Sequence, residues 1–188
     1  NLEKIFDNKP IYKNDLKSKN LKAQSLKSDY LKFPKSICSV CNGNVTQPFD
    51  RSWDIIFNYL FDNKKIIIPN SKIKLNKIFK YDTKRHMLNV HLYCLKILGC
   101  VLNDIFNTVL PNMGEHLQRR KAFKNFYLCF GTKDQNINTK EIHWSDVHLI
   151  RKDVIFFSIY YEHTTISFFY SFSDIDYPAK KIGWSSLK

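Results

Sequence analysis

The spacing of apolar residues predicts two helices in the first part of the chain. After Pro48, apolar residues recur at i, i+3, i+4, i+7 and i+8, namely Trp53, Ile56, Phe57, Leu60 and Phe61. They share one face of an amphipathic helix, with Asp50 as the expected N-cap residue and an end near 62–63. Between 84 and 110, apolar residues fall on almost every face, which is typical of a helix buried in a core.

The apolar period changes after a short basic helix predicted at 115–121. Alternation of apolar and polar residues predicts strands at 126–130, 141–150, 154–161 and 164–172, with the short connections of an antiparallel meander. Shorter extended segments are expected at 65–68 and 73–75, on either side of a turn at 69–71. The pattern therefore predicts an α+β fold in which a C-terminal antiparallel sheet packs on the central helix.

The chain of 188 residues, 44 % of them apolar, is expected to form one folded domain after a basic arm. The arm, 1–35, contains nine lysines and four acidic residues, and its polar runs show no clear period, so weak order is expected. Such an arm either lies along a phosphate backbone or is simply a solvated surface. The domain, 36–188, is predicted to comprise a turn and helix (36–63), the core helix (84–110) and the strands (123–172).

Two cysteines at metal-ligand spacing, Cys38 and Cys41, precede the first predicted helix. A C-x-x-C pair lets two thiolates bind one ion and supplies half of a tetrahedral zinc site, which needs two further ligands. The alternative is a pair of reduced cysteines in a turn. A thioredoxin-like redox pair is disfavoured, because no βαβ pattern surrounds it and no helix is predicted to begin at Cys38.

The segment that begins with this pair carries a family resemblance. Cys38-x-x-Cys41-Asn42, followed by Thr46-Gln47-Pro48-Phe49-Asp50-Arg51, resembles the last third of the HNH (ββα-metal) endonuclease fold. This segment is similar to a group of bacterial and phage HNH-like proteins. Two later segments, 88–93 and 145–148, resemble the same group, and the resemblance covers roughly 21–188. It implies structural zinc on Cys38 and Cys41, Asn42 at the position of the family's last catalytic motif residue, and a catalytic divalent cation such as magnesium.

One part of the family pattern is missing from the sequence. The resemblance implies an upstream C-x-x-C and an acidic-His pair, but no His or Cys precedes Cys38. Two interpretations follow: part of a nuclease, or a relative that kept the scaffold without the chemistry. The second corresponds to a non-catalytic nucleic-acid-binding subunit of a phage-defence or nucleoprotein complex, with a possible protein partner. A plain protein-interaction module is a third hypothesis.

The charge balance favours a polyanionic partner. Thirty Lys plus Arg against seventeen Asp plus Glu give a formal net charge of +13, which is typical of nucleic-acid-binding proteins. DNA is the favoured ligand, although coding bias and a merely solvated surface also explain part of the lysine excess. The candidate nucleic-acid-binding residues, with Phe79 and Tyr81 interleaved among the first of them, are Lys72, Lys74, Lys77, Lys80, Lys84, Arg85, Arg119 and Arg120.

Two further pairs of residues carry weaker chemical signals. His91 and Cys94 share a helix face and would complete the zinc site if they packed against it, but a core histidine bonded to a backbone carbonyl is favoured. Asp146 and His148 share a strand face, with His143 on the other, and an edge-strand hydrogen bond is the favoured interpretation.

The number of cysteines and the length of the apolar runs indicate the cellular compartment in which the protein is expected. The chain has five cysteines, an odd number, which suits a reducing cytoplasm. No run reaches the about 18 apolar residues of a membrane span, since the closest, 154–172, is broken by Glu162 and His163. A cytoplasmic protein without a membrane span is expected.

Overall fold

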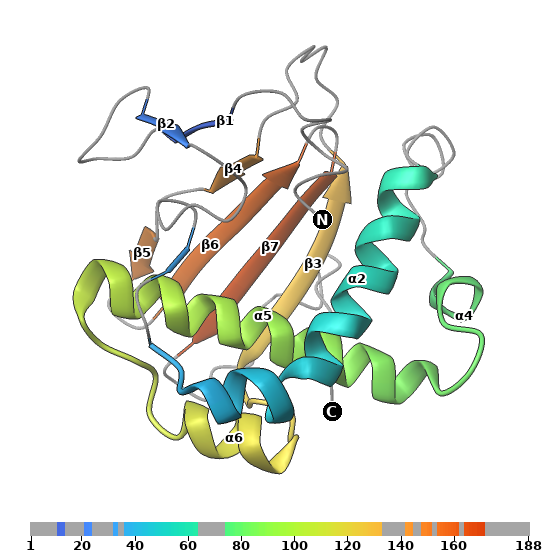
Figure 1. Cartoon of the computed structure of the whole chain (residues 1–188), viewed down its shortest axis with the longest axis horizontal. Coiled ribbons are helices and arrows are strands. Elements are labelled where there is room, and N and C mark those ends of the chain that lie inside the picture. The colour runs from blue at the N-terminus through green and yellow to red at the C-terminus, as the bar shows by residue number, and fades with distance from the viewer. Residues whose placement is uncertain are drawn as a thin grey trace.

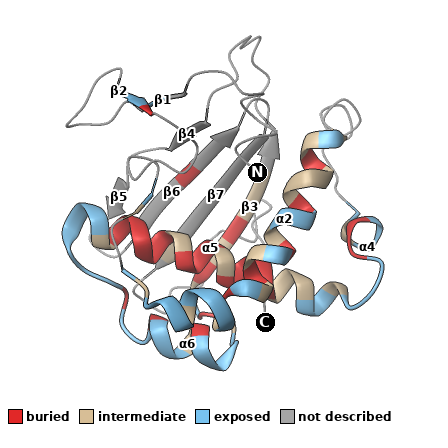
Figure 2. Ribbon diagram, viewed as in Figure 1, coloured by how far each residue is buried: buried red, intermediate tan, exposed pale blue. Residues whose placement is uncertain are grey.

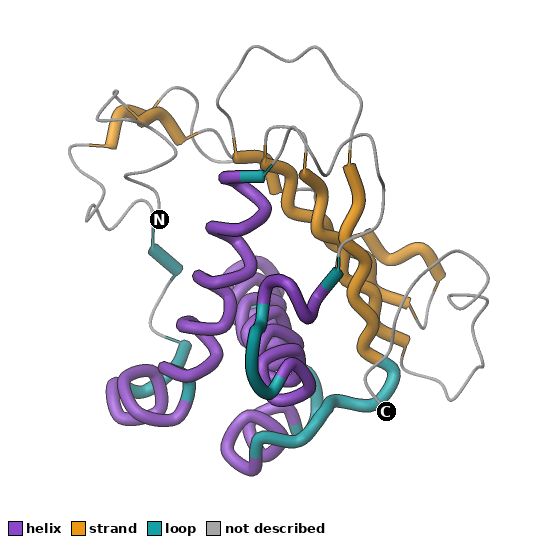
Figure 3. Tube along the Cα trace, turned by 90° about the vertical axis from the view of Figure 1, so that its right-hand side faces the viewer, coloured by secondary structure: helices purple, strands orange, loops and turns teal. Residues whose placement is uncertain are grey.

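The computed structural model of the chain describes residues 11–13, 21–23, 32–33, 36–63, 74–132, 142–144, 148–151, 154–161 and 164–171. Helices form one layer and a five-stranded sheet forms the other, so the mixed α+β class is as expected. Helix α5 (Thr83–Phe106) runs across one face of the sheet, and α2 (Gln47–Asp62) packs against α5 (Figures 1 and 3).

The central helix α5 has residues in left-handed conformation at both ends. Asp82 (φ 46°) is the N-cap, and its carboxylate accepts a hydrogen bond from the N–H of Arg85 at 3.3 Å. Asn107 (φ 51°) is the C-cap, so the helix ends at Phe106 instead of at 110 as predicted. Asparagine and aspartate adopt this conformation more readily than most residues, which makes them suitable ends for a helix.

Two short helices flank α5 in the sequence. Helix α4 (Leu75–Ile78) lies where an extended segment was predicted at 73–75, so that prediction is wrong at Leu75. The other predicted segment, 65–68, lies outside the described residues. Helix α6 (Met113–Arg119) begins two residues before the predicted 115–121, with Asn112 (φ 59°) before it and Arg120 (φ 51°) after it.

The sheet is formed by antiparallel pairs in the order β3-β7-β6-β4, and β5 also pairs with β6. Strands β6 and β7 form a hairpin in which Tyr161 is opposite Thr164. The stretch predicted as one strand, 141–150, contains the two separate strands β4 and β5. The strand bounds are β3 Phe126–Thr132, β4 Ile142–Trp144, β5 His148–Arg151, β6 Val154–Tyr161 and β7 Thr164–Ser171.

The core lies where α5 is enclosed by α2 and β3. Buried residues continue along α5, as Figure 2 shows, and they form one apolar core with residues of both neighbours. Burying one such side chain contributes about 1.5–3 kcal/mol, so this contact holds α2 firmly in place. The largest fully buried apolar side chains are those of Phe49 and Ile56 of α2, Leu92, Leu95 and Leu98 of α5, and Phe126 of β3.

The predicted arm contains a small hairpin. Strands β1 (Ile11–Lys13) and β2 (Leu21–Ala23) pair antiparallel, with Ile11 opposite Ala23. The arm, expected to be extended and weakly ordered, thus contains paired strands at these six positions. Apart from 32–33, the remainder of 1–35 lies outside the described residues.

One helix in the described part of the chain, α5, is long and apolar enough to cross a bilayer. Within its most apolar window, 67 % of the residues are buried inside the protein, as in the core helix of a folded domain. This helix, and not 154–172, is therefore the segment closest to a membrane span. The expected absence of a span stays a prediction.

Candidate functional site

The two cysteines of the C-x-x-C pair lie on a helical turn that leads directly into α2. Residues 39–45 are helical, with the π-helical turn η2 at Cys41–Val45. The backbone N–H of Cys41 donates to Cys38 Sγ at 3.2 Å, and the N–H of Asn42 donates to the Cys38 carbonyl at 2.9 Å. We call residues 38–46 the cysteine turn. It presents an exposed Cys38 and Asn42 and a partly exposed Cys41.

The hydrogen bonds of the cysteine turn shift the pKa values of its two thiols in opposite directions. The pKa of Cys38 is lowered, chiefly because the Cys41 N–H donates to its sulfur and also because the Cys41 side chain hydrogen-bonds to it. The pKa of Cys41 is raised, chiefly by its hydrogen bond to the Cys38 side chain. An N–H donor stabilises a thiolate, which is the form that binds metals and attacks electrophiles. Because a helix does begin directly after Cys38, the helix-based argument against a redox pair is wrong.

Thr46, not the predicted Asp50, is the N-cap of α2, and Pro48 occupies the first turn. Thr46 is 1 % exposed, and its hydroxyl donates to the Asn42 carbonyl at 3.0 Å. Its Oγ1 also accepts from Lys96 Nζ of α5 at 3.4 Å. Asp50 lies one turn into α2 and forms an ion pair with the same ammonium group. A buried lysine thus fixes the junction between the cysteine turn and α2 to the central helix.

A second polar contact fixes α2 two residues after Asp50, at Ser52. Ser52 Oγ, in a side chain only 1 % exposed, lies 3.0 Å from His86 Nδ1 and accepts from Asn89 Nδ2 at 3.1 Å. Next to it, Trp53 stacks on Tyr93 with ring centroids 4.6 Å apart and an interplanar angle of 12°. Stacked rings and satisfied buried polar groups both favour one fixed packing of the two helices.

The segment that carries the family resemblance therefore divides into two sets of residues. One set is buried or paired against α5, and its contacts with that helix account for its residue types: Thr46, Phe49, Asp50, Ser52 and Trp53. The other set faces solvent and is not required for that packing: Cys38, Asn42, Gln47 and Arg51, with Cys41 partly exposed. The exposed set contains the residue types that bind metals and polar substrates.

The cysteine turn fits half of a zinc site. Within the described part of the chain, no group of three or more His, Cys, Asp and Glu side chains is arranged to hold a metal ion. A closed tetrahedral site needs two ligands in addition to Cys38 and Cys41. Among the described residues, Cys38 and Cys41 are thus a pair of thiols and not a closed metal site.

His91 and Cys94 do not complete this site, so that alternative is wrong. His91 is 1 % exposed, and its Nε2 accepts the backbone N–H of Phe123 at 3.0 Å. Burial, with a smaller effect of His116, lowers its pKa to about 4. Cys94 is fully buried, which raises its thiol pKa. His91 is thus a core histidine, as favoured from the sequence, although its partner is an N–H and not a carbonyl.

The predicted nucleic-acid-binding residues lie in two separate groups. One group lies in and next to α4 and in the first turn of α5, and its members are all exposed: Lys74, Lys77, Lys80, Lys84 and Arg85. Arg119 and Arg120 are exposed at the end of α6, which contacts η2 and lies away from α4 (Figure 1). Arg119 pairs with Glu115 at 3.2 Å, and Lys72 lies outside the described residues.

The residues around the other histidines are only partly described. His143 lies in β4 and His148 in β5, so they do not share one strand as predicted. Strand β5 pairs with β6, where His148 is opposite Phe156. Asp146, the proposed partner of His148, lies outside the described residues.

No protein-family model matches the sequence, and neither a curated protein nor a solved structure matches the chain. The sequence pointed to Cys38, Cys41 and Asn42 of the exposed set. It did not predict that Lys96, His86 and Asn89 contact the segment 46–52. The one available signal for Lys96 was that it is the single charged residue within the largely apolar 92–102.

Proposed function

We propose that this chain belongs to an HNH-like, metal-dependent endonuclease that acts on nucleic acid, with DNA as the favoured substrate. The observation that carries the proposal is the division of the segment 38–53 into a buried set, used to dock α2 on α5, and an exposed set on the cysteine turn. Packing alone requires the first set and not the second. The residues that packing does not require include Cys38, Cys41 and Asn42, to which the resemblance assigns the zinc and catalytic roles.

In this proposal Cys38 and Cys41 hold a structural zinc ion. The N–H of Cys41 on Cys38 Sγ favours the thiolate form, and thiolates are preferred zinc ligands. Two ligands from outside the described residues would close the site. Bound zinc would hold the turn in one conformation and so keep Asn42 in position within η2.

Asn42 is proposed to act at the catalytic end of the turn. Its backbone makes two hydrogen bonds: its N–H donates to the Cys38 carbonyl, and its carbonyl accepts from Thr46 Oγ1. The residue itself is exposed to solvent. A fixed backbone with an exposed amide suits a residue that orients a substrate or a metal ligand. A divalent cation such as magnesium would stabilise the leaving oxygen of the phosphodiester.

The cleavage test compares Asn42→Ala with Asn44→Ala in the protein at its natural full length. Both asparagines are exposed in the same turn, so the second variant controls for loss of a surface amide. With plasmid DNA and magnesium, the proposal expects at least a tenfold loss of cleavage for Asn42→Ala and little change for Asn44→Ala. Equal cleavage by both variants contradicts the role of Asn42.

A second candidate is a non-catalytic nucleic-acid-binding subunit of a phage-defence or nucleoprotein complex. It is favoured by the exposed cationic group on α4 and α5, which requires no cleavage chemistry. The same assay separates the two candidates. Wild-type protein that shifts DNA in a salt-dependent manner but does not cut it with any of magnesium, manganese or zinc supports the second candidate.

A further inference from the structure

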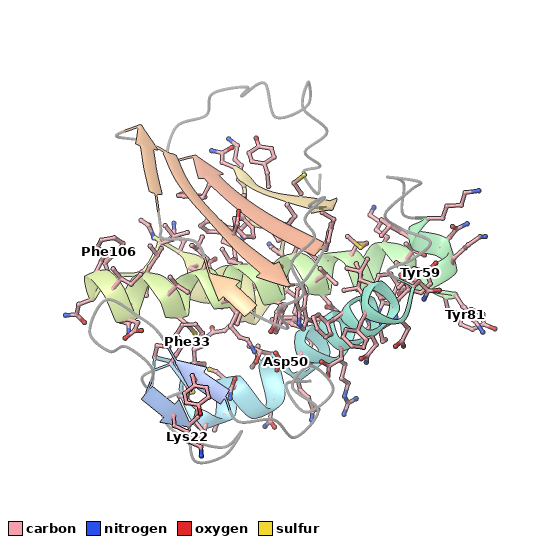
Figure 4. The ribbon with its side chains drawn as sticks, turned by 90° about the horizontal axis from the view of Figure 1, so that it is seen from above. Lys22, Phe33, Asp50, Tyr59, Tyr81 and Phe106 are labelled. Atoms are coloured by element: carbon pink, nitrogen blue, oxygen red, sulfur yellow. The ribbon has the colours of Figure 1, made fainter. Side chains whose placement is uncertain are left out.

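The segment that joins α4 to α5 combines positive charge with an exposed aromatic ring. We call residues 74–85 the α4–α5 platform. It contains five basic residues and one acidic residue, and all five basic residues are exposed. Tyr81 is 84 % exposed, the largest exposed fraction among the large apolar residues that the structure describes. Figure 4 shows Tyr81 at one end of the molecule, opposite the end that carries Phe106.

The backbone below this ring is held in place by buried contacts. Phe79, two residues earlier, is 3 % exposed and stacks on His86 with ring centroids 4.7 Å apart and an interplanar angle of 2°. His86 Nδ1 in turn lies 3.0 Å from Ser52 Oγ of α2. Tyr81 is therefore presented by a turn anchored on both sides, through Phe79 and through the start of α5.

The charge of the platform is largely available to a ligand. Its one acidic side chain, Asp82, accepts the N–H of Arg85 at 3.3 Å as the N-cap of α5. Lys80 immediately precedes Tyr81, and Lys84 and Arg85 follow in the first turn of the helix. An exposed ring costs free energy in water unless a ligand covers it, and cations on either side of it suit a ligand with phosphates flanking an apolar face.

We propose that the α4–α5 platform binds single-stranded nucleic acid, with Tyr81 stacked on an unpaired base and the neighbouring cations on the flanking phosphates. A base in a duplex is stacked on its neighbours and offers no free face, whereas an unpaired base does. Stacking is tolerant of sequence, so binding without strong base preference is expected. The proposal is independent of zinc and of cleavage, because neither the cysteine turn nor Asn42 takes part.

The test measures fluorescence anisotropy of the full chain with three probes: a short oligothymidylate, an oligonucleotide of the same length made of abasic sites, and a duplex. Tyr81→Ala should bind oligothymidylate roughly 5- to 100-fold more weakly, since stacking on one base has that worth. It should bind the abasic probe as wild type does. Tyr81→Phe should retain affinity, and Tyr12→Ala, a tyrosine 54 % exposed outside the platform, is the matched control.

A charge variant gives an independent readout. Lys84→Ala should weaken binding to both single-stranded probes and reduce the slope of log K against log salt by about 0.7, the value for one phosphate contact on a single strand. Tyr81→Ala should leave that slope unchanged. Unaltered affinity of Tyr81→Ala for oligothymidylate, an equal loss on the abasic probe, or tighter binding of the duplex would each overturn the proposal. None of these outcomes depends on metal content or on nuclease activity.

Discussion

The ammonium group of Lys96 on α5 forms an ion pair with the carboxylate of Asp50 on α2. The Lys96 side chain is 8 % exposed and that of Asp50 is 39 % exposed, so most of the desolvation falls on the lysine. Lys96 Nζ also donates to Thr46 Oγ1 at 3.4 Å and lies 5.4 Å from the centre of the Tyr93 ring. One buried cation thus links the N-cap of α2, the first turn of α2 and the central helix.

This arrangement predicts unequal effects of removing the two charges. Asp50→Asn leaves a buried ammonium group without its counter-charge and should lower the free energy of unfolding by about 2–4 kcal/mol. Lys96→Met leaves a carboxylate that already reaches solvent and should cost less, about 1 kcal/mol. Urea unfolding of both variants measures the difference. In the double variant, Lys96→Met should recover most of the stability lost in Asp50→Asn; a strictly additive double variant contradicts the coupling.

The protonation of His91 predicts acid sensitivity. Burial, then the charge of His116, lowers the His91 pKa from 6.5 to about 4. The unfolded chain therefore binds a proton near pH 6.5 that the folded protein binds only near pH 4. Folding stability should fall as the pH decreases across this window, by about 3 kcal/mol at most, and should be unaffected by His91 above pH 7.

The variant His91→Gln isolates this effect. A glutamine oxygen can accept the Phe123 N–H that His91 Nε2 accepts at 3.0 Å, and it does not titrate. The slope of stability against pH between 4 and 6.5 should become shallower by one proton in His91→Gln. An identical slope in wild type and variant would show that other groups cause the acid sensitivity.

Ser52 is predicted to contribute more to the free energy of unfolding than the size of its side chain suggests. Its hydroxyl accepts from Asn89 Nδ2 at 3.1 Å, and Asn89 is only 7 % exposed. Ser52→Ala would leave that buried amide without this partner and should cost about 1–3 kcal/mol in the free energy of unfolding. Ser39→Ala, at an exposed serine of the cysteine turn, is the control and should change stability by less than about 0.5 kcal/mol. Thermal unfolding of both variants checks the contrast.

Local pattern predicted the long helices better than their ends. The apolar residues of 84–110 predict burial on all sides, and α5 has this burial over most of 89–102, whereas Ile105 and Phe106 are more than half exposed. The helix stops at Phe106 because Asn107 adopts a left-handed conformation, a property of one backbone position that hydrophobic periodicity does not report. Likewise, Thr46 and Asp50 are both good N-cap types, and the local sequence does not show that Thr46 is the N-cap or that both residues contact Lys96 of α5.

The candidate site shows the same limit. The C-x-x-C spacing is local, so its exposed thiols were predictable from the sequence. His91 and Cys94 are buried in the core, and this depends on the tertiary packing. The 3.0 Å hydrogen bond between His91 and Phe123, for example, joins residues more than thirty positions apart. The candidate cationic residues that the structure describes are exposed, but their separation into two groups depends on where α4 and α6 lie around α5.

The central claim, that Cys38 and Cys41 hold zinc, is tested most directly by counting the metal. Native mass spectrometry and elemental analysis would be applied to the protein at its natural full length and to Cys38→Ser, Cys41→Ser and Cys129→Ser; Cys129 is a partly exposed cysteine of β3. The account predicts about one zinc per chain in wild type and Cys129→Ser, and none in the other two variants. A wild-type protein without zinc, or zinc retained in both Cys38→Ser and Cys41→Ser, would contradict it.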